Sequence, residues 1–235
     1  MKARCALLAG CFMPAGLIAF ALRARAQANV PKGVVSRLNQ STNVLLEMSA
    51  GPHVTEGDLA RARCIAVIPA LKQGAFIVGV RHGAGFASCR TTAGWSAPAA
   101  VEISGGSVGL QAGGQESDVV LALLSPAAEH QLLQQRLKFG TNATVMAGSV
   151  GKVTEKSHAD ALVWSRSGGA FAGVGVGVNG ATLKADESAN RELYGRGITL
   201  EQVLSGRVRT PPVAAQFWQV LNRVSPVPAV KPRAG

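Results

Sequence analysis

Ser107 lies in a pattern that could carry nucleophilic catalysis. Residues 105–109 read Gly-Gly-Ser-Val-Gly, which fits the Gly-x-Ser-x-Gly pattern of the nucleophile elbow in α/β-hydrolases. In such an elbow the serine ends a strand, and a helix begins directly after it. The residues after Ser107 instead alternate and reach Gly113-Gly114, which predicts a strand that ends in a turn. We therefore interpret this stretch as a glycine-rich strand.

A catalytic serine would also need an acid and a base. Asp118 with His130, or Asp118 with His158, could supply them in order, but a chain of this size offers such sets by chance. We expect no catalytic residue, and an exported serine hydrolase using Ser107 is the alternative class of function.

No cofactor is expected from the remaining motifs. The stretches "GVRHGAGF" and "FAGVGVGVNG" resemble phosphate-binding loops, but no helix is predicted directly after either, as a dinucleotide site requires. The four histidines are far apart and no Cys-x-x-Cys pair occurs, so no metal site is expected.

The first 26 residues have the pattern of a secretory signal. A short basic segment precedes an uncharged, mostly apolar run over 5–22, and residues 24–26, Ala-Arg-Ala, offer small residues where a signal peptidase reads. Cleavage before Gln27 is expected, which places the protein in the periplasm or envelope. The alternatives are lipidation at Cys11 and retention as a membrane anchor.

The net charge of the chain after the leader indicates which kinds of partner it could bind. Removing the leader, with four of the 24 basic residues and none of the 13 acidic ones, leaves 209 residues with a formal net charge of +7. A basic exported protein can meet anionic lipid, nucleic acid or acidic polysaccharide. The basic residues are scattered without a run of five, so no nucleic-acid partner is expected.

Two cysteines remain after the leader, Cys64 and Cys89. Export places them where disulfides persist, and each lies beside a predicted strand, so a disulfide is predicted. Closing this loop is worth on the order of 3 kcal/mol in the chain-entropy account. The alternative is two separate buried thiols.

Start signals and hydrophobic periodicity predict several helices. Thr55 with Asp58, and Ser125 before Pro126, have the spacing of helix N-termini. The predicted helices span 34–48, 55–63, 125–138, 186–194, 199–204 and 214–224.

Short apolar runs predict strands over much of the remaining chain. "CIAVIP" is a buried strand expected to stop at Pro69, and closely spaced strands follow from 75 to 124. Asn179-Gly180 is a hairpin signal within a later run. The predicted class is α+β, a β-rich antiparallel sheet or barrel-like sandwich with several packed helices. One domain is expected over 27–224, followed by a proline-rich disordered tail over 225–235.

The predicted helix over 34–48 has one apolar side. Val34, Leu38, Leu45 and Met48 form it, and its polar side is mainly Asn and Gln. Packing into the core is the ordinary interpretation of such a helix. Membrane contact through the same side is the alternative.

Several segments together resemble the SYLF domain family. They are "CIAVIP", "LKQGAFIVGVRHGAGFASCR", "GWSAPAAVEISGGSVGLQAGG", "SRSGGAFAGVGV" and "DESANRELYG", and the resemblance covers roughly residues 30–222. In this family the serine-containing string is a fold signature, as is a later Asp-x-x-x-Asn-x-x-x-Tyr-Gly. The positions that match these signatures are Ser107, Gln111, Gly113, Asp186, Asn190, Tyr194 and Gly195. The resemblance therefore implies structural roles for them.

The resemblance also implies lipid binding. Eukaryotic members bind phosphoinositides, partly through an amphipathic N-terminal helix, and exported bacterial members look like lipid-binding proteins. We therefore expect a non-enzymatic protein that binds anionic or amphipathic lipid at an envelope membrane. A structural envelope protein without a ligand is a further alternative.

The basic residues of the first elements are the predicted lipid-binding surface. The helix over 34–48 carries only Arg37, with Lys32 just before it, and each basic residue near an anionic surface is worth about 1 kcal/mol. Basic residues of the next two elements are expected to add to it. The full predicted set is Lys32, Arg37, Arg61, Arg63, Lys72, Arg81 and Arg90.

Overall fold

A computed structural model gives the fold. It describes residues 30–75, 78–108, 113–139, 145–147, 160–167, 170–174, 178 and 180–226. The leader and residues 227–235, which hold most of the predicted tail, lie outside the described residues, as do Gln111 and His158. Ser225, assigned to the tail from the sequence, is fully buried and belongs to the fold.

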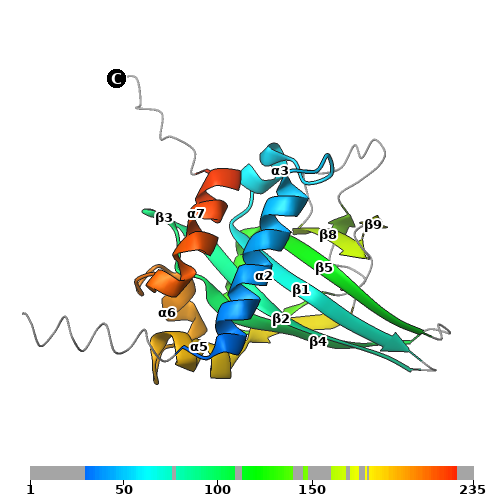
Figure 1. The fold of residues 1–235 in the computed structure, drawn as a ribbon. Coiled ribbons are helices and arrows are strands. Elements are labelled where there is room, and N and C mark those ends of the chain that lie inside the picture. Colours follow the sequence, from blue (N-terminus) through cyan, green and yellow to red (C-terminus); the bar gives the residue numbers. More distant parts are fainter. Residues whose placement is uncertain are drawn as a thin grey trace, which may run out of the picture.

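The centre of the molecule is one curled sheet (Figure 1). Its ten described strands follow the order β6-β10-β4-β2-β1-β5-β8-β7, with β3 paired to β2 and β9 paired to β8. Every pairing is antiparallel except that of β7 with β8. This confirms the predicted class. The strands are β1 (Cys64–Ala75), β2 (Val78–Thr91), β3 (Gly94–Trp95), β4 (Ala99–Val108), β5 (Gly113–Leu123), β6 (Leu137–Lys138), β7 (Val145–Ala147), β8 (Ala161–Ser167), β9 (Ala170–Val174) and β10 (Ala181–Ala185).

Helices cover both faces of this sheet. The long α2 and the C-terminal α7 lie side by side across one face, as Figure 1 shows. Residues of α4 and α6 join the apolar core on the other face. The helices are α2 (Lys32–Ser49), α3 (Glu56–Ala60), α4 (Pro126–Leu133), α5 (Glu187–Tyr194), α6 (Leu200–Leu204) and α7 (Ala215–Val224), with a 3-10 turn η2 (Pro212–Ala214) before α7.

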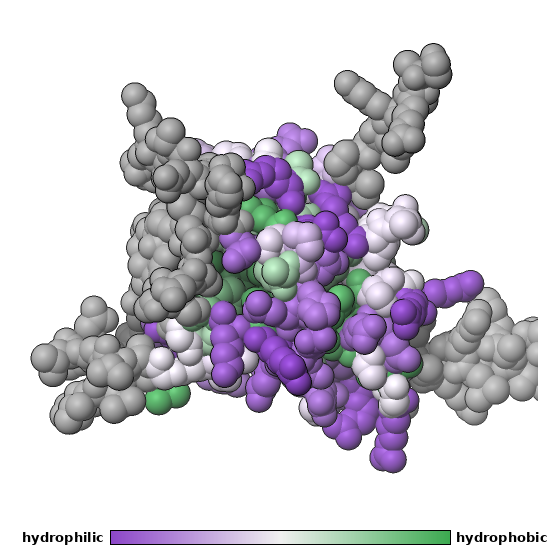
Figure 2. All heavy atoms as spheres, turned by 180° about the vertical axis from the view of Figure 1, so that it is seen from behind, coloured by the Kyte–Doolittle hydropathy of each residue, from purple (hydrophilic) through white to green (hydrophobic). Residues whose placement is uncertain are grey.

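The apolar side of α2 is buried against the sheet. Val34, Leu38, Leu45 and Met48 are between 0% and 6% exposed and share a core with Phe86 and Phe217. Core packing is therefore the correct interpretation of this side. The opposite face of the molecule, seen in Figure 2, shows mostly hydrophilic side chains among its described atoms. In the described part of the chain no helix combines the length and the apolarity that crossing a bilayer requires.

The sequence placed the helix starts well because each has a local cause. Thr55, Ser125, Asp186 and Thr199 each accept a hydrogen bond from the backbone N–H three residues later. These bonds satisfy N–H groups that the first turn of a helix leaves free.

The predicted stop at Pro69 is wrong. β1 continues to Ala75 by inserting one extra residue against both neighbouring strands, between Ile68 and Leu71 on the β5 side. Ala70 has a φ of 52° there and donates its N–H to Asp118 Oδ1. A β-bulge tolerates a proline that a regular ladder does not.

One predicted helix end is also wrong. The helix that starts after Ser125 ends at Leu133 rather than near Lys138, because Gln135 turns the chain with a φ of 57° and Leu137–Lys138 form β6.

A turn precedes β10, where the sequence predicted one. Gly180 has a φ of 77°, and Ala181 donates its N–H to Val178 O. After this turn β10 pairs with β4 and β6.

Candidate functional site

A groove between α2 and the β1–β2 strands is the best candidate site. It has a volume of about 360 Å³. Its walls come from the exposed side of α2 and from the strand residues around the bulge. The described residues that line it are Gly33, Ser36, Arg37, Gln40, Pro69, Ala70, Lys72, His82, Gly83 and Ala84.

Close packing of β2 under the bulge forms the floor of this groove. A Cβ atom on Gly83 would lie 2.7 Å from the Ile68 side chain, and one on Gly85 would lie 1.9 Å from the Val67 carbonyl oxygen. Only glycine permits that approach, because any larger residue would push β2 away from β1. The glycines of the stretch that resembles a phosphate-binding loop therefore shape the sheet beneath the groove.

The groove has a basic lining. Lys72 and His82 are direct cross-strand partners, both exposed, and Arg37 faces them from α2. None of the described residues that line the groove carries a carboxylate. Two acids lie just outside it: Asp186 accepts a 2.6 Å hydrogen bond from Arg37, and Glu116 is the partner of Lys72 on β5. The groove thus offers cationic and N–H donor groups to an anion.

A second depression adjoins the groove along α2. Its described lining includes Val30, Lys32 and Asn39, and it shares Ser36 and Gln40 with the groove. The cation of Lys32 therefore lies next to the same surface. We refer to the groove and this depression together as the α2 groove.

A network of hydrogen bonds and ion pairs holds the bulge beside the groove. Asp118 accepts hydrogen bonds from the Ala70 N–H at the bulge and from Arg166 on β8. Arg166 also donates to Glu47 of α2 at 2.7 Å. These two carboxylates raise the pKa of Arg166 further, chiefly through the hydrogen bond with Asp118. The network ties α2, the bulge and two strands together.

The seven basic residues predicted to bind lipid do not form one surface. Lys32, Arg37 and Lys72 lie at the α2 groove. Arg61 caps the C-terminus of α3, and Arg63 pairs with Glu129 of α4. The structure therefore brings three of the seven residues together and places Arg61 and Arg63 outside the groove lining.

Arg81 is buried and Arg90 is half-buried, and neither lines the α2 groove. Arg81 is 7% exposed, and burial lowers the pKa of its guanidinium. Arg90 donates to Ala62 O at 2.8 Å and to Ser225 Oγ at 2.7 Å, and its guanidinium carbon lies 4.5 Å from the centre of the Trp95 ring. Arg90 therefore joins the end of β2 to the chain segments beside it.

Sequence reasoning missed His82. The face of the sheet on which the His82 side chain lies depends on the register between β1 and β2. That register shifts at the bulge. The signal that could have found it is Pro69 within an apolar run, since proline inside a strand indicates a bulge.

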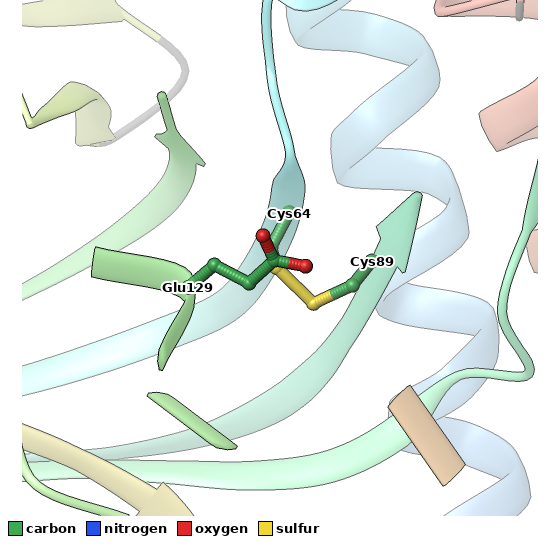
Figure 3. A group of neighbouring side chains, drawn as sticks. All are labelled: Cys64, Cys89 and Glu129. Atoms are coloured by element: carbon green, nitrogen blue, oxygen red, sulfur yellow. A yellow bond between two sulfur atoms is a disulfide. The ribbon is translucent and has the colours of Figure 1, made fainter. Parts of the chain in front are cut away.

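Cys64 and Cys89 form a disulfide in the structure. They are direct partners on β1 and β2, with Cα atoms 3.9 Å apart. This is below the limit of about 7 Å beyond which a bridge cannot form. The carboxylate of Glu129 lies beside the two sulfur atoms (Figure 3). Sulfur in a disulfide has no thiolate to offer a metal, so this group is a structural crosslink next to the Arg63–Glu129 ion pair.

The backbone around Ser107 is that of a strand. Ser107 lies within β4 opposite Gly79 of β2, and β5 begins at Gly113, five residues after Val108. That spacing leaves no room for the helix of a nucleophile elbow. Asp118, the expected acid, is bonded to Arg166, and the ring of His130 lies near Gln134 on α4. Gly113 itself is the partner of Ala75.

The later signature residues dock α5 onto the sheet. Asp186 caps α5 and holds Arg37. The buried side chain of Asn190 accepts from Ala100 N–H and donates to Ala100 O, so it pairs with β4 as a neighbouring strand would. Tyr194 donates its hydroxyl to Pro98 O, and Gly195 ends the helix with a φ of 89°.

The chain is similar to one family model and to several known proteins. The family model Ysc84, described as Las17-binding protein actin regulator, matches residues 104–224. Protein YSC84 of Saccharomyces cerevisiae is 31% identical over 82% of this chain, and LAS seventeen-binding protein 3 of the same yeast is 30% identical over 82%. The rat SH3 domain-containing YSC84-like protein 1 is also 30% identical over 82%.

The match covers only part of these relatives. The chain spans 44%, 45% and 60% of their respective lengths. No solved structure gives a significant match.

Proposed function

Because the chain belongs to the Ysc84 family, whose domain is the SYLF domain, we propose that it is a non-enzymatic protein that binds anionic lipid at a membrane surface. The leader-like first 26 residues support export and an envelope membrane as the place of binding. The strand context of Ser107 supports a role without catalysis.

The α2 groove carries this proposal. Arg37, Lys72 and His82 converge on it from three elements, and Lys32 lies next to it. Guanidinium and ammonium groups and ring N–H donors are the partners that phosphate oxygens take. About 1 kcal/mol for each cation near an anionic surface makes such binding modest, and salt weakens it.

The burial of α2 points to recognition of headgroups rather than insertion of this helix. Its apolar side chains, Leu38 and Leu45 among them, are already packed in the core. Releasing them would cost the stability that their burial provides, about 1.5 to 3 kcal/mol for each such side chain. The exposed side of α2, with Lys32, Ser36 and Gln40, is the side available to a headgroup.

Vesicle sedimentation at low salt tests the proposal. The double variant Lys32→Glu/Lys72→Glu should bind vesicles of mixed phosphatidylcholine and phosphatidylglycerol at least about tenfold more weakly than the parent, since two attractions become repulsions. Pure phosphatidylcholine vesicles should bind either form poorly.

A matched variant separates the groove from net charge. Arg207→Glu/Arg209→Glu changes the charge equally, and both residues are exposed. They follow Gly206, which contacts Thr91, nine residues along β2 from His82 and therefore about 30 Å away. Equal weakening by both variants would leave net charge as the only determinant and remove the groove. Parent binding that shows no preference for anionic vesicles would remove the function.

The name of one yeast relative and the description of the family model mention binding to Las17, a protein. Native mass spectrometry of the purified chain separates the two classes of ligand. A lipid that co-purifies with the parent and is lost from Lys32→Glu/Lys72→Glu supports the proposal, whereas a protein partner held without lipid contradicts it.

A further inference from the structure

Four strands project together beyond the helices. β4, β2, β1 and β5 are neighbours in that order, and they run past α2 and end at the same side of the molecule (Figure 1). Their register aligns the ends in rows. Ala75 lies opposite Gly79 and Gly113, and Gly79 lies opposite Ser107. We call the described residues 73–75, 78–80, 105–108 and 113–115 the four-strand tip.

The tip carries no charge. The sequence holds no Asp, Glu, Lys or Arg from 73 to 80, nor from 103 to 115. These are two separate stretches of the chain, and only the pairing of β2 with β4 and of β1 with β5 unites them. A continuous uncharged end on a basic protein is a feature of the fold rather than of one segment.

The tip also exposes apolar surface. Val80 is 65% exposed, and among the described residues it is the single large apolar side chain classed as exposed. Its partners in the next strands are Gly74 and Gly106, which leave the valine side chain without a flanking side chain. A single exposed apolar side chain is ordinary on a protein surface, so what distinguishes Val80 is its position in an uncharged end of the sheet.

Charged and polar groups begin at the base of the tip, where the buried Arg81 lies in one row with Gln73 and Gly105. The next row is exposed at Lys72 and His82. Lys72, His82 and Ser104 form one row across three strands, with Glu116 at its β5 end. Lys72 and His82 are also lining residues of the α2 groove. Three residues separate this row from Ala75, which is about 10 Å at the rise of a strand. Interfacial segments enter a bilayer by about 5 to 10 Å.

We propose that the four-strand tip inserts into the interfacial region of an anionic bilayer while the α2 groove holds headgroups at its base. The proposal rests on the lipid-binding function proposed above and adds a second, apolar contact to it. The arrangement of an uncharged end above a basic row fits the layers of a bilayer, in which apolar chains lie beneath phosphate groups. A tip that entered the bilayer would bring Lys72 and His82 to headgroup level.

The first test substitutes Val80. Val80→Asp should weaken sedimentation with the phosphatidylglycerol-containing vesicles by about tenfold, because a charge replaces an apolar side chain that the bilayer would bury. Val80→Leu should retain parent binding. Gln216→Asp, an exposed substitution on α7, introduces the same charge away from the tip and should leave binding within about twofold. Circular dichroism melting verifies that each variant is folded.

The second test measures depth. In Val80→Trp, lipids brominated near the glycerol end of the acyl chain should quench fluorescence beyond the quenching seen for the parent, which has three tryptophans of its own. Quenching equal to that of the parent would overturn insertion.

The outcomes separate this inference from the proposed function. If Val80→Asp binds like the parent while Lys32→Glu/Lys72→Glu does not, the groove stands and the tip does not insert. If neither variant loses binding, both the groove and the tip fail as lipid-binding sites. The proposed function itself fails if the parent shows no preference for anionic vesicles. Sedimentation velocity adds one more outcome: a parent dimer that Val80→Asp dissociates would make the tip a contact between two copies and overturn membrane insertion.

Discussion

The two ends of the β1–β2 hairpin differ in how their polar groups are used. At one end the Cys64–Cys89 disulfide, the Arg90 bonds and the buried Trp95 hold the strands to the C-terminal segment. At the other end Lys72, His82 and Val80 are exposed. The first end is built for stability, whereas the second keeps its charges and its apolar side chain available to a partner. Substitutions at each end test whether the first end contributes stability and the second contributes binding.

Among the substitutions of polar and crosslinking residues, the largest effect is expected at Arg90. Arg90→Ala should lower the free energy of unfolding by about 3 to 4 kcal/mol, because it leaves carbonyl and hydroxyl groups near Ala62 and Ser225 without their charged donor and removes the Trp95 contact. Urea denaturation measures the change. Arg207→Ala, an exposed control, should change it by less than about 0.5 kcal/mol. A parent-like Arg90→Ala would mean that this end is not held by the guanidinium.

The disulfide is the next largest contribution. Cys64→Ala/Cys89→Ala should cost on the order of 3 kcal/mol of stability, because the crosslink restricts the unfolded chain. Urea denaturation of the parent with and without a reductant should reproduce the difference. Vesicle binding of the folded double variant should stay unchanged, since Lys72 lies eight residues along β1 from Cys64. Lost binding at constant folding would show that the two ends are coupled.

Asn190 tests the docking of α5. Asn190→Ala should cost about 2 kcal/mol, because the buried N–H and C=O of Ala100 both lose their partner. Ser188→Ala, exposed on the same helix, should cost less than about 0.5 kcal/mol. Equal effects of the two substitutions in urea denaturation would show that the signature asparagine does not hold β4.

Tyr194 gives a pH test of the same contact. Burial raises the pKa of its hydroxyl well above the usual value near 10, so the folded state keeps the proton that the unfolded state releases. The contribution is fully present below about pH 10 and is lost as the pH rises further, so stability should fall above that pH. In Tyr194→Phe this alkaline fall should be smaller, and at pH 7 the variant should lose about 1 kcal/mol with the Pro98 hydrogen bond. An unchanged alkaline profile would contradict the assignment.

Features with local causes could be predicted from the sequence. The caps at Thr55, Ser125 and Asp186 lie within three residues of the groups they bind, so spacing alone reveals them. The α+β class follows from similar local periodicity. The strand through Pro69 could not be predicted, because an extra residue in β1 has meaning only against β2 and β5.

Only those residues of the candidate site that depend on local sequence could be predicted. Lys32 and Arg37 follow from the helix itself. The place of His82 in the groove, the burial of Arg81 and the bonding of Arg90 to the C-terminal segment depend instead on strand register and packing. Pairing between segments that are distant in sequence decides which basic residues share a surface. This pairing cannot be inferred from any one segment alone.

The smallest effect on stability is expected at Val80, at the exposed end of the hairpin. This substitution distinguishes the two ends most directly. Val80→Asp should change the free energy of unfolding by less than about 1 kcal/mol, because Val80 is 65% exposed and only strand propensity is lost. Phe86, six residues further along β2 and fully buried, is the matched control: Phe86→Ala should cost about 3 to 5 kcal/mol. Urea denaturation measures both. A large loss at Val80 would mean that the tip is part of the folded core, and its effect on vesicles would then report folding rather than contact. A small loss, together with weakened vesicle binding, would show that this end of the hairpin contributes to binding and not to stability.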